Sequence, residues 1–191
     1  MHRFLLLLAA SVTIGATPAL AQMAEPQARQ GFGISFGLGT GSAGVDCSGC
    51  SSDRTSGLSG YLRLGGHLRP DLFLGAESNG WVHSESGVDE TVGFYSAVVQ
   101  WYPNVATGFY VKGGLGLATY LATDGVDDIT GSAIGLTAGL GYDFRVGRNL
   151  SLTPYLNYLR SGKGELEVND ISSGFNVSSN ILQVGLGLTW H

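Results

Sequence analysis

The feature that most constrains this chain is a period-two alternation of large apolar residues with small or polar ones, which dominates from residue 31 onward. The last segment shows it most clearly, with Leu182, Val184, Leu186, Leu188 and Trp190 on one side and Gln183, Gly185, Gly187 and Thr189 on the other. Successive side chains of a β-strand point to opposite faces, so the pattern predicts strands with one bulky apolar face and one face of small residues. Helical periodicity is not sustained anywhere in this region.

Eight strands are predicted, near residues 32–39, 58–68, 72–83, 91–102, 109–117, 134–144, 150–160 and 182–190. Their connections alternate in length. Tight turns at 69–71, 103–107 and 147–149 alternate with longer polar stretches near 42–56, 84–90, 122–131 and 161–179. Short periplasmic turns and long outer loops are typical of transmembrane barrels. The expected fold is therefore all-β: an eight-stranded antiparallel up-and-down transmembrane β-barrel.

Composition indicates which face of these strands meets lipid. Charged residues make up only 13% of the chain, and 31 of its 191 residues are glycine. No apolar run after residue 30 reaches the roughly 20 residues that a membrane-spanning helix needs, so a membrane span must use strands. A water-soluble barrel would need a polar outer face, and glycine there would weaken the strands without compensation. We therefore expect bulky apolar side chains to contact lipid and small residues to fill the lumen.

The N-terminus has the organisation of an export signal. A basic start at His2 and Arg3 precedes an apolar run over 4–10 and the small-residue site Ala19-Leu20-Ala21. We expect a cleaved signal peptide over 1–21, a short N-terminal segment over 22–30 and the outer-membrane β-barrel domain over 31–191. The predicted location is the bacterial outer membrane.

The strands carry five ionisable residues on their small-residue face, namely Arg63, His67, Glu77, Lys112 and Asp143. An isolated buried charge is costly, so we expect these residues to form a lumen network of opposite charges. Such a network would serve either as an ion gate or as a structural plug. The narrow lumen of an eight-stranded barrel favours the plug.

Aromatic residues gather near the predicted strand ends. Phe73 and Trp101 lie toward the tight turns, whereas Trp81 and Tyr158 lie toward the long loops. Because amphipathic rings prefer the headgroup level of a membrane, this placement predicts two aromatic girdles on the outer surface.

The glycine-rich strands, the turn pattern and the ending over 185–191 resemble the family of small eight-stranded outer-membrane barrels that includes the OmpA transmembrane domain. In that family, a last strand that finishes on an aromatic residue is the signal recognised by the barrel assembly machinery. The resemblance implies this role for Leu186, Leu188 and Trp190, and it implies the assembly machinery as a partner during biogenesis.

Other chemistry is sparse in this sequence. Cys47 and Cys50 lie in the first long loop, where a local disulfide is the leading interpretation and a redox centre or half of a zinc site the alternative. No metal site or cofactor is predicted. His83, Ser84 and Glu85 invite comparison with lipid A-modifying enzymes, but adjacent strand residues face opposite ways. A net charge of −5 without a basic stripe argues against nucleic acid as a partner.

The sequence thus favours a non-enzymatic role in envelope structure and surface interaction. Outer-membrane lipid and lipopolysaccharide are the expected surroundings, and extracellular loops would determine envelope integrity or adhesion through a ligand that the sequence does not name. The alternatives are a narrow ion or solute channel and, from another class, a lipid A-modifying enzyme.

Overall fold

The computed structural model describes residues 28–47, 54–85, 87–123, 128–168 and 171–191, without the side chains of 45–47, 128, 165–168 and 171–177. The predicted signal peptide and Cys50 lie outside the described residues, as does the side chain of Cys47. Among the described residues, no helix is long and apolar enough to cross a membrane.

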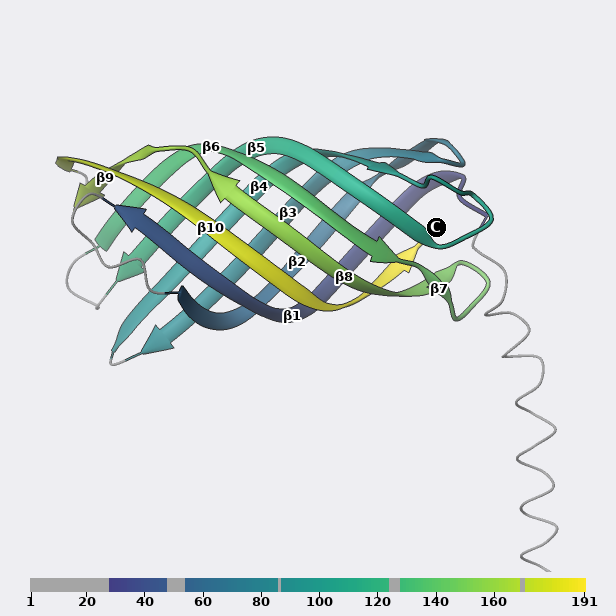
Figure 1. The fold of residues 1–191 in the computed structure, drawn as a ribbon, viewed down its shortest axis with the longest axis horizontal. Coiled ribbons are helices and arrows are strands. Elements are labelled where there is room, and N and C mark those ends of the chain that lie inside the picture. The colour runs from purple at the N-terminus through teal and green to yellow at the C-terminus, as the bar shows by residue number, and fades with distance from the viewer. Residues whose placement is uncertain (1–27, 48–53, 86, 124–127, 169–170) are drawn as a thin grey trace, which may run out of the picture.

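Ten strand segments build a barrel of eight antiparallel strands (Figure 1). The segments are β1 (Gly31–Cys47), β2 (Arg54–Arg69), β3 (Leu72–Glu85), β4 (Val88–Trp101), β5 (Phe109–Thr123), β6 (Asp128–Tyr142), β7 (Phe144–Arg145), β8 (Leu150–Ser161), β9 (Gly164–Val168) and β10 (Ile171–Trp190). β7 continues β6 in the same register against β8, and β8 and β9 are successive parts of one long strand beside β10. The predicted fold class is confirmed.

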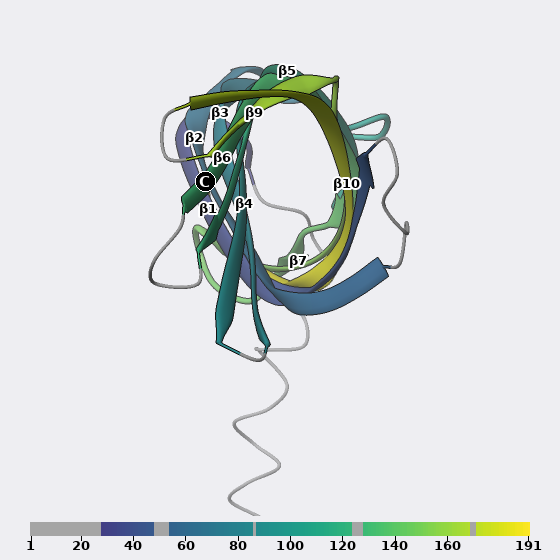
Figure 2. The same ribbon diagram turned by 90° about the vertical axis from the view of Figure 1, so that its left-hand side faces the viewer.

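The barrel closes where the first and last long strands meet. β1 pairs antiparallel with β2 on one side and with β10 on the other, from Ile34 opposite Trp190 to Cys47 opposite Val177. Figure 2 looks into the barrel from one end and shows the closed ring. Closure satisfies the edge hydrogen bonds that an open sheet would expose, which a span through lipid requires.

The strand faces are oriented as expected. Outward side chains are bulky and exposed, for example Leu38 at 67% and Ile134 at 73%, whereas the alternating residues are buried in the lumen. The predicted girdles are only partly correct: Trp101 and Tyr158 lie outside at 48% and 41% exposure, but Phe73 and Trp81 point inward at 5% and 1%. The face to which a side chain points depends on whether its residue number is odd or even within the strand, and not on how near the residue is to the strand end.

The barrel has two unlike ends. The β2–β3, β4–β5 and β7–β8 connections form the turn end, which also holds the C-terminus, and the remaining hairpins form the loop end (Figure 1). Strands extend further toward the loop end than predicted, since β1 reaches Cys47 and β10 begins at Ile171. The apolar alternation stops earlier because it follows the lipid boundary, whereas hydrogen-bonded pairing continues through polar residues beyond that boundary.

Candidate functional site

The lumen contains a buried group of charged and amide side chains, here called the ionic layer, which consists of Arg63, Glu77, Asn79, Gln100 and Lys112. Glu77 is its centre. Its carboxylate lies 2.5 Å from Lys112 Nζ and 3.5 Å from Arg63 Nε, and it accepts a 2.9 Å hydrogen bond from Asn79. Arg63 and Glu77 are register neighbours on β2 and β3. One carboxylate is therefore held between two cations with almost no solvent contact.

Arg63 connects this centre to the turn end. Its guanidinium lies 5.1 Å from the centre of the Tyr61 ring and 5.5 Å from that of Tyr110, and it donates to the side-chain oxygen of Gln100. Gln100 in turn donates to the Tyr102 hydroxyl over 2.5 Å. Aromatic faces attract a guanidinium, so the rings help to hold its charge inside the barrel.

A chain of hydroxyl groups continues from Tyr102. The Tyr102 hydroxyl donates to Asp143 over 2.8 Å, and Thr153 donates to the same carboxylate over 2.7 Å. Thr153 shares a 2.9 Å hydrogen bond with Thr189, which reaches Ser35 over 2.8 Å. Ser35 then contacts the Tyr61 hydroxyl over 2.8 Å, so the chain returns to the ring beside Arg63.

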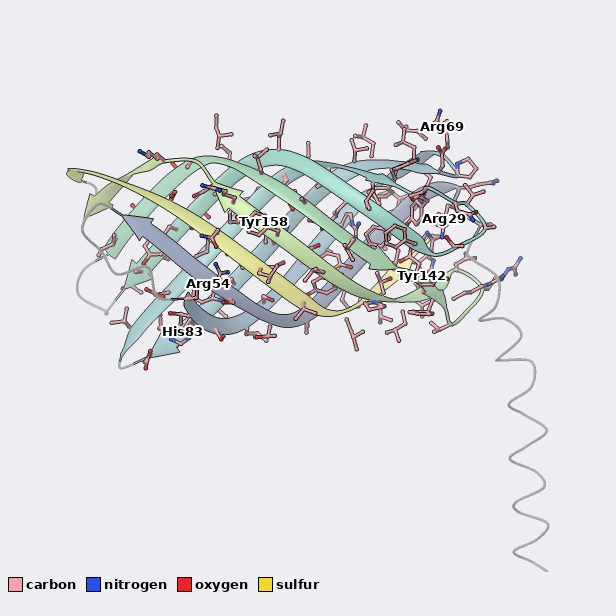
Figure 3. The ribbon with its side chains drawn as sticks, viewed as in Figure 1. Arg29, Arg54, Arg69, His83, Tyr142 and Tyr158 are labelled. Atoms are coloured by element: carbon pink, nitrogen blue, oxygen red, sulfur yellow. The ribbon has the colours of Figure 1, made fainter. Side chains whose placement is uncertain are left out.

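Arg29 covers the turn end of the lumen, just before β1. Its guanidinium lies 3.8 Å from the centre of the Tyr102 ring and donates to the carbonyls of Thr107 and Val105 over 2.8 and 3.3 Å. Figure 3 shows Arg29 at the same end as Arg69 and Tyr142. The segment before the barrel thus ties the β4–β5 turn to the lumen contents.

His191 follows β10 at this end and is buried. Its Nε2 lies 3.7 Å from Asp143, and its ring centre is 5.6 Å from that of His67. Burial, followed by the positive charges of Arg29 and Arg63, lowers the pKa of His191 to about 4. His191 is therefore neutral at pH 7, although its ring lies beside Asp143.

Toward the loop end the lumen changes character. Buried apolar side chains pack together there as the apolar layer, which consists of Ala43, Trp81, Val92, Phe94, Ala118, Leu159 and Ile181. Trp81 lies four residues beyond Glu77 on β3 and donates its ring N–H to the Gly41 carbonyl over 3.0 Å. Gly135 permits this packing, because a methyl group at that position would lie 2.8 Å from the Phe94 ring. Two filled layers of different chemistry therefore follow each other along the barrel axis.

The family model described as outer membrane protein beta-barrel domain matches residues 6–189. The chain belongs to this outer-membrane barrel family. The structure of Neisserial surface protein A matches with a TM-score of 0.58 and 18% identity, over 83% of this chain and 96% of that one. OprG from Pseudomonas aeruginosa matches with a TM-score of 0.50 and 15% identity, over 86% and 98%. A comparison with curated proteins finds no match.

Membership of this family places the barrel in the bacterial outer membrane, with its apolar outer face against lipid. The structure brings Arg63, Glu77 and Lys112 together. Asp143 lies apart from them and is reached through Gln100 and Tyr102.

His67 also lies on the lumen face, but among the described residues it is paired with neither Glu77 nor Asp143. Its ring packs edge-on against Phe73 with 5.2 Å between ring centres, and among the described residues its nitrogens have no hydrogen-bond partner. Sequence reasoning missed Arg29, Gln100 and Tyr102. The parity of β4 carries a signal for Gln100 and Tyr102, which share a face with Ser96 and Val98, but no strand periodicity reaches Arg29.

The remaining predicted residues lie elsewhere. β3 continues through residues 83–85, so His83 and Ser84 point to opposite faces; His83 contacts Glu85 over 3.3 Å and stacks on Trp81. Among the described residues, no group of three or more histidines, cysteines or acids is placed to hold a metal ion. Leu186, Leu188 and Trp190 lie on the outer face of β10, at the seam with β1. Their role in assembly stays a prediction.

Proposed function

We propose that this protein is a rigid, non-conducting outer-membrane barrel whose exposed loop end performs a structural and surface-interaction role, in envelope integrity or adhesion. One observation carries the proposal: side chains fill the lumen in two successive layers. The ionic layer is cross-linked by charge, and the apolar layer excludes polar solutes. An ion would have to displace both layers, each at the cost of several kcal/mol.

The closed lumen leaves the surface as the part that can act. The β3–β4 hairpin diverges from the rest of the loop end (Figures 1 and 2). Its tip presents the exposed residues Glu85, Val88 and Asp89. A hydrogen-bonded hairpin on a rigid barrel offers a partner a contact surface with little ordering cost.

Planar-bilayer recording tests the closed lumen. Protein folded in detergent and inserted into a bilayer is expected to produce no steady current at any applied voltage. Heat-modifiable migration of the same preparation shows that the barrel is folded. A reproducible unitary conductance from folded protein would refute the non-conducting barrel.

A deletion strain tests the surface role. Loss of the protein is expected to increase sensitivity to detergents or to reduce attachment to surfaces and other cells, and the intact chain is expected to restore both. Replacement of the β3–β4 hairpin over 84–89 should fail to restore at least one of them. The matched replacement of the turn over 103–107 should restore both. Full restoration by the hairpin variant would contradict a role for this hairpin.

A further inference from the structure

Two arginines lie on the outer surface of the barrel where its apolar band ends. Arg54 begins β2 and Arg160 precedes the last residue of β8, and both are exposed. They share the outward parity of the exposed Leu58 and Leu156 on the same strands. Cations at this level lie at the headgroup region of a membrane and not in its hydrocarbon.

Strand register places the two arginines in one row. Arg54 pairs with Gly44 on β1, Gly44 pairs with Asn180 on β10, and Asn180 pairs with Arg160 on β8. Three steps of about 4.8 Å separate their Cα atoms by about 14 Å. We call Arg54, Asn180 and Arg160 the rim patch. Figure 3 shows Arg54 on the same side of the barrel as Tyr158, which precedes Arg160 on the outward face of β8.

The guanidinium of Arg54 reaches across β1 toward this row. Its Nε donates to the Ser42 hydroxyl over 3.0 Å, and its other nitrogens donate to the Ser42 carbonyl and to the Asn180 side-chain oxygen. Gly44 allows this course, since a methyl group there would lie 3.2 Å from Nη1. The side chain is thus fixed on the barrel surface, with N–H groups left to bind an anion.

The partners of Arg54 are neutral, so its charge is not compensated by them. Among the described residues, neither Arg54 nor Arg160 forms an ion pair. The turn end offers a contrast, because the exposed Arg69 is paired with Asp71 at 2.9 Å. The rim patch therefore presents positive charge to the membrane surface, whereas Arg69 does not.

An apolar groove lies on the outer wall, further along β2 from Arg54 toward the turn end. This outer groove measures about 450 Å³ and runs over β1, β2 and β3. Its floor is made by Gly60, Ser78 and Gly80, and its walls by Leu38, Leu58 and Val82. Leu58 follows Arg54 by four residues on β2, or about 13 Å along the strand. The positive site and the apolar furrow are thus connected along β2, with the furrow nearer the middle of the barrel wall.

We propose that the rim patch and the outer groove bind one molecule of lipopolysaccharide, with a phosphate between Arg54 and Arg160 and an acyl chain in the groove. The barrel lies in the outer membrane, and its loop end is the side expected at the cell exterior. The lipid there carries phosphate groups above acyl chains, in the same order as the two features. The inference depends on the membrane location and is independent of the proposed surface role.

Binding of purified rough lipopolysaccharide to the folded full-length protein in detergent tests the rim patch. Arg54→Gln and Arg160→Gln are each expected to weaken binding about fivefold, and the double variant about twenty-fivefold, because each surface cation contributes a factor of about five. Arg69→Gln, the matched control at the turn end, should bind like the wild type. Wild-type affinity in the double variant would overturn the proposal.

Competition distinguishes the sources of phosphate. Phosphatidylglycerol micelles and inorganic pyrophosphate are expected to displace lipopolysaccharide only at much higher concentrations. Equal competition by pyrophosphate would indicate a site for soluble anions, and equal competition by phosphatidylglycerol a site for any anionic lipid; either result would overturn the assignment.

The groove has its own matched pair of variants. A Cβ atom at Gly80 would meet nothing within 4 Å, so Gly80→Leu is expected to fill part of the groove and to leave the barrel intact. It is expected to weaken lipopolysaccharide binding about threefold or more by excluding one acyl contact. Gly113→Leu places the same side chain on β5, where the nearest atom is 3.9 Å away, and should have no effect. If Gly80→Leu bound lipopolysaccharide as tightly as Gly113→Leu does, an acyl chain would not be the occupant of the groove. The same conclusion would follow if the protein formed a dimer without lipid and only Gly80→Leu abolished that dimer.

Discussion

The two halves of the lumen are both filled by side chains, but the side chains differ in chemistry. Toward the turn end, the ionic layer and its hydroxyl chain join Glu77 to Asp143 by hydrogen bonds and ion pairs. Toward the loop end, Trp81, Phe94 and their neighbours pack together as a buried apolar cluster. A polar layer requires every partner to be present, whereas an apolar layer requires only that volume be filled. The two halves should therefore respond differently to substitution.

The largest effect is expected in the ionic layer. Glu77→Ala leaves Arg63 and Lys112 buried without a counter-charge, which should lower the free energy of unfolding by about 4 kcal/mol. Urea titration in detergent micelles, followed by heat-modifiable migration, measures this loss. The double variant Glu77→Ala, Lys112→Met should recover part of it. A loss below about 1 kcal/mol in the single variant would show that the layer is not cross-linked by charge.

The apolar layer should be nearly as sensitive but for another reason. Phe94→Ala removes a fully buried ring and is expected to cost about 3.5 kcal/mol through lost contacts and an unfilled cavity. The same titration measures it, and Phe94→Leu should restore most of the loss because it refills volume. If Phe94→Leu were as damaging as Phe94→Ala, shape and not volume would control this half.

Acid is expected to destabilise the turn end through His191. Because the pKa of His191 is lowered to about 4, the unfolded chain takes up a proton below about pH 6.5 that the folded chain refuses. Stability is therefore expected to fall by up to about 3 kcal/mol between pH 6.5 and pH 4. His191→Asn should remove this part of the pH dependence. An unchanged pH profile in that variant would assign the effect to other groups.

The smallest effect concerns the fit of the apolar layer. Gly135→Ala drives a methyl group toward the Phe94 ring and should cost about 2 kcal/mol. Gly113→Ala adds the same group on the lipid face, where the nearest atom is 3.9 Å away, and should be close to neutral. Equal effects of the two substitutions would show that the lumen has room to spare.

The same contrast explains what the sequence could predict. Period-two parity identified the lumen face of Arg63, Glu77 and Lys112, because side-chain direction in a strand is local. Which of them touch depends on the stagger between strands, and that stagger is a property of the closed barrel. Asp143 shares the face of Lys112 but lies at another level, so it joins Tyr102 and not the ionic centre.

The apolar layer was missed for a related reason. Trp81 lies near a strand end, where an aromatic residue favours the membrane interface, yet its parity matches that of Glu77 and turns it inward. A general preference of aromatic residues is weaker than the alternation of the strand. Arg29 lies before the first strand, and its place beneath Tyr102 is a tertiary contact without a periodic signal.

Tryptophan fluorescence tests the central claim, the orientation of the two faces, most directly. The chain has three tryptophans: Trp81 in the lumen at 1% exposure, and Trp101 and Trp190 on the outer wall at 48% and 55%. In bilayers of brominated lipid, a variant that keeps only Trp101 and Trp190 should be strongly quenched. A variant that keeps only Trp81 should resist both brominated lipid and aqueous acrylamide. Strong quenching of Trp81 by lipid would show that the faces are reversed, and quenching by acrylamide would show that the lumen is open to water.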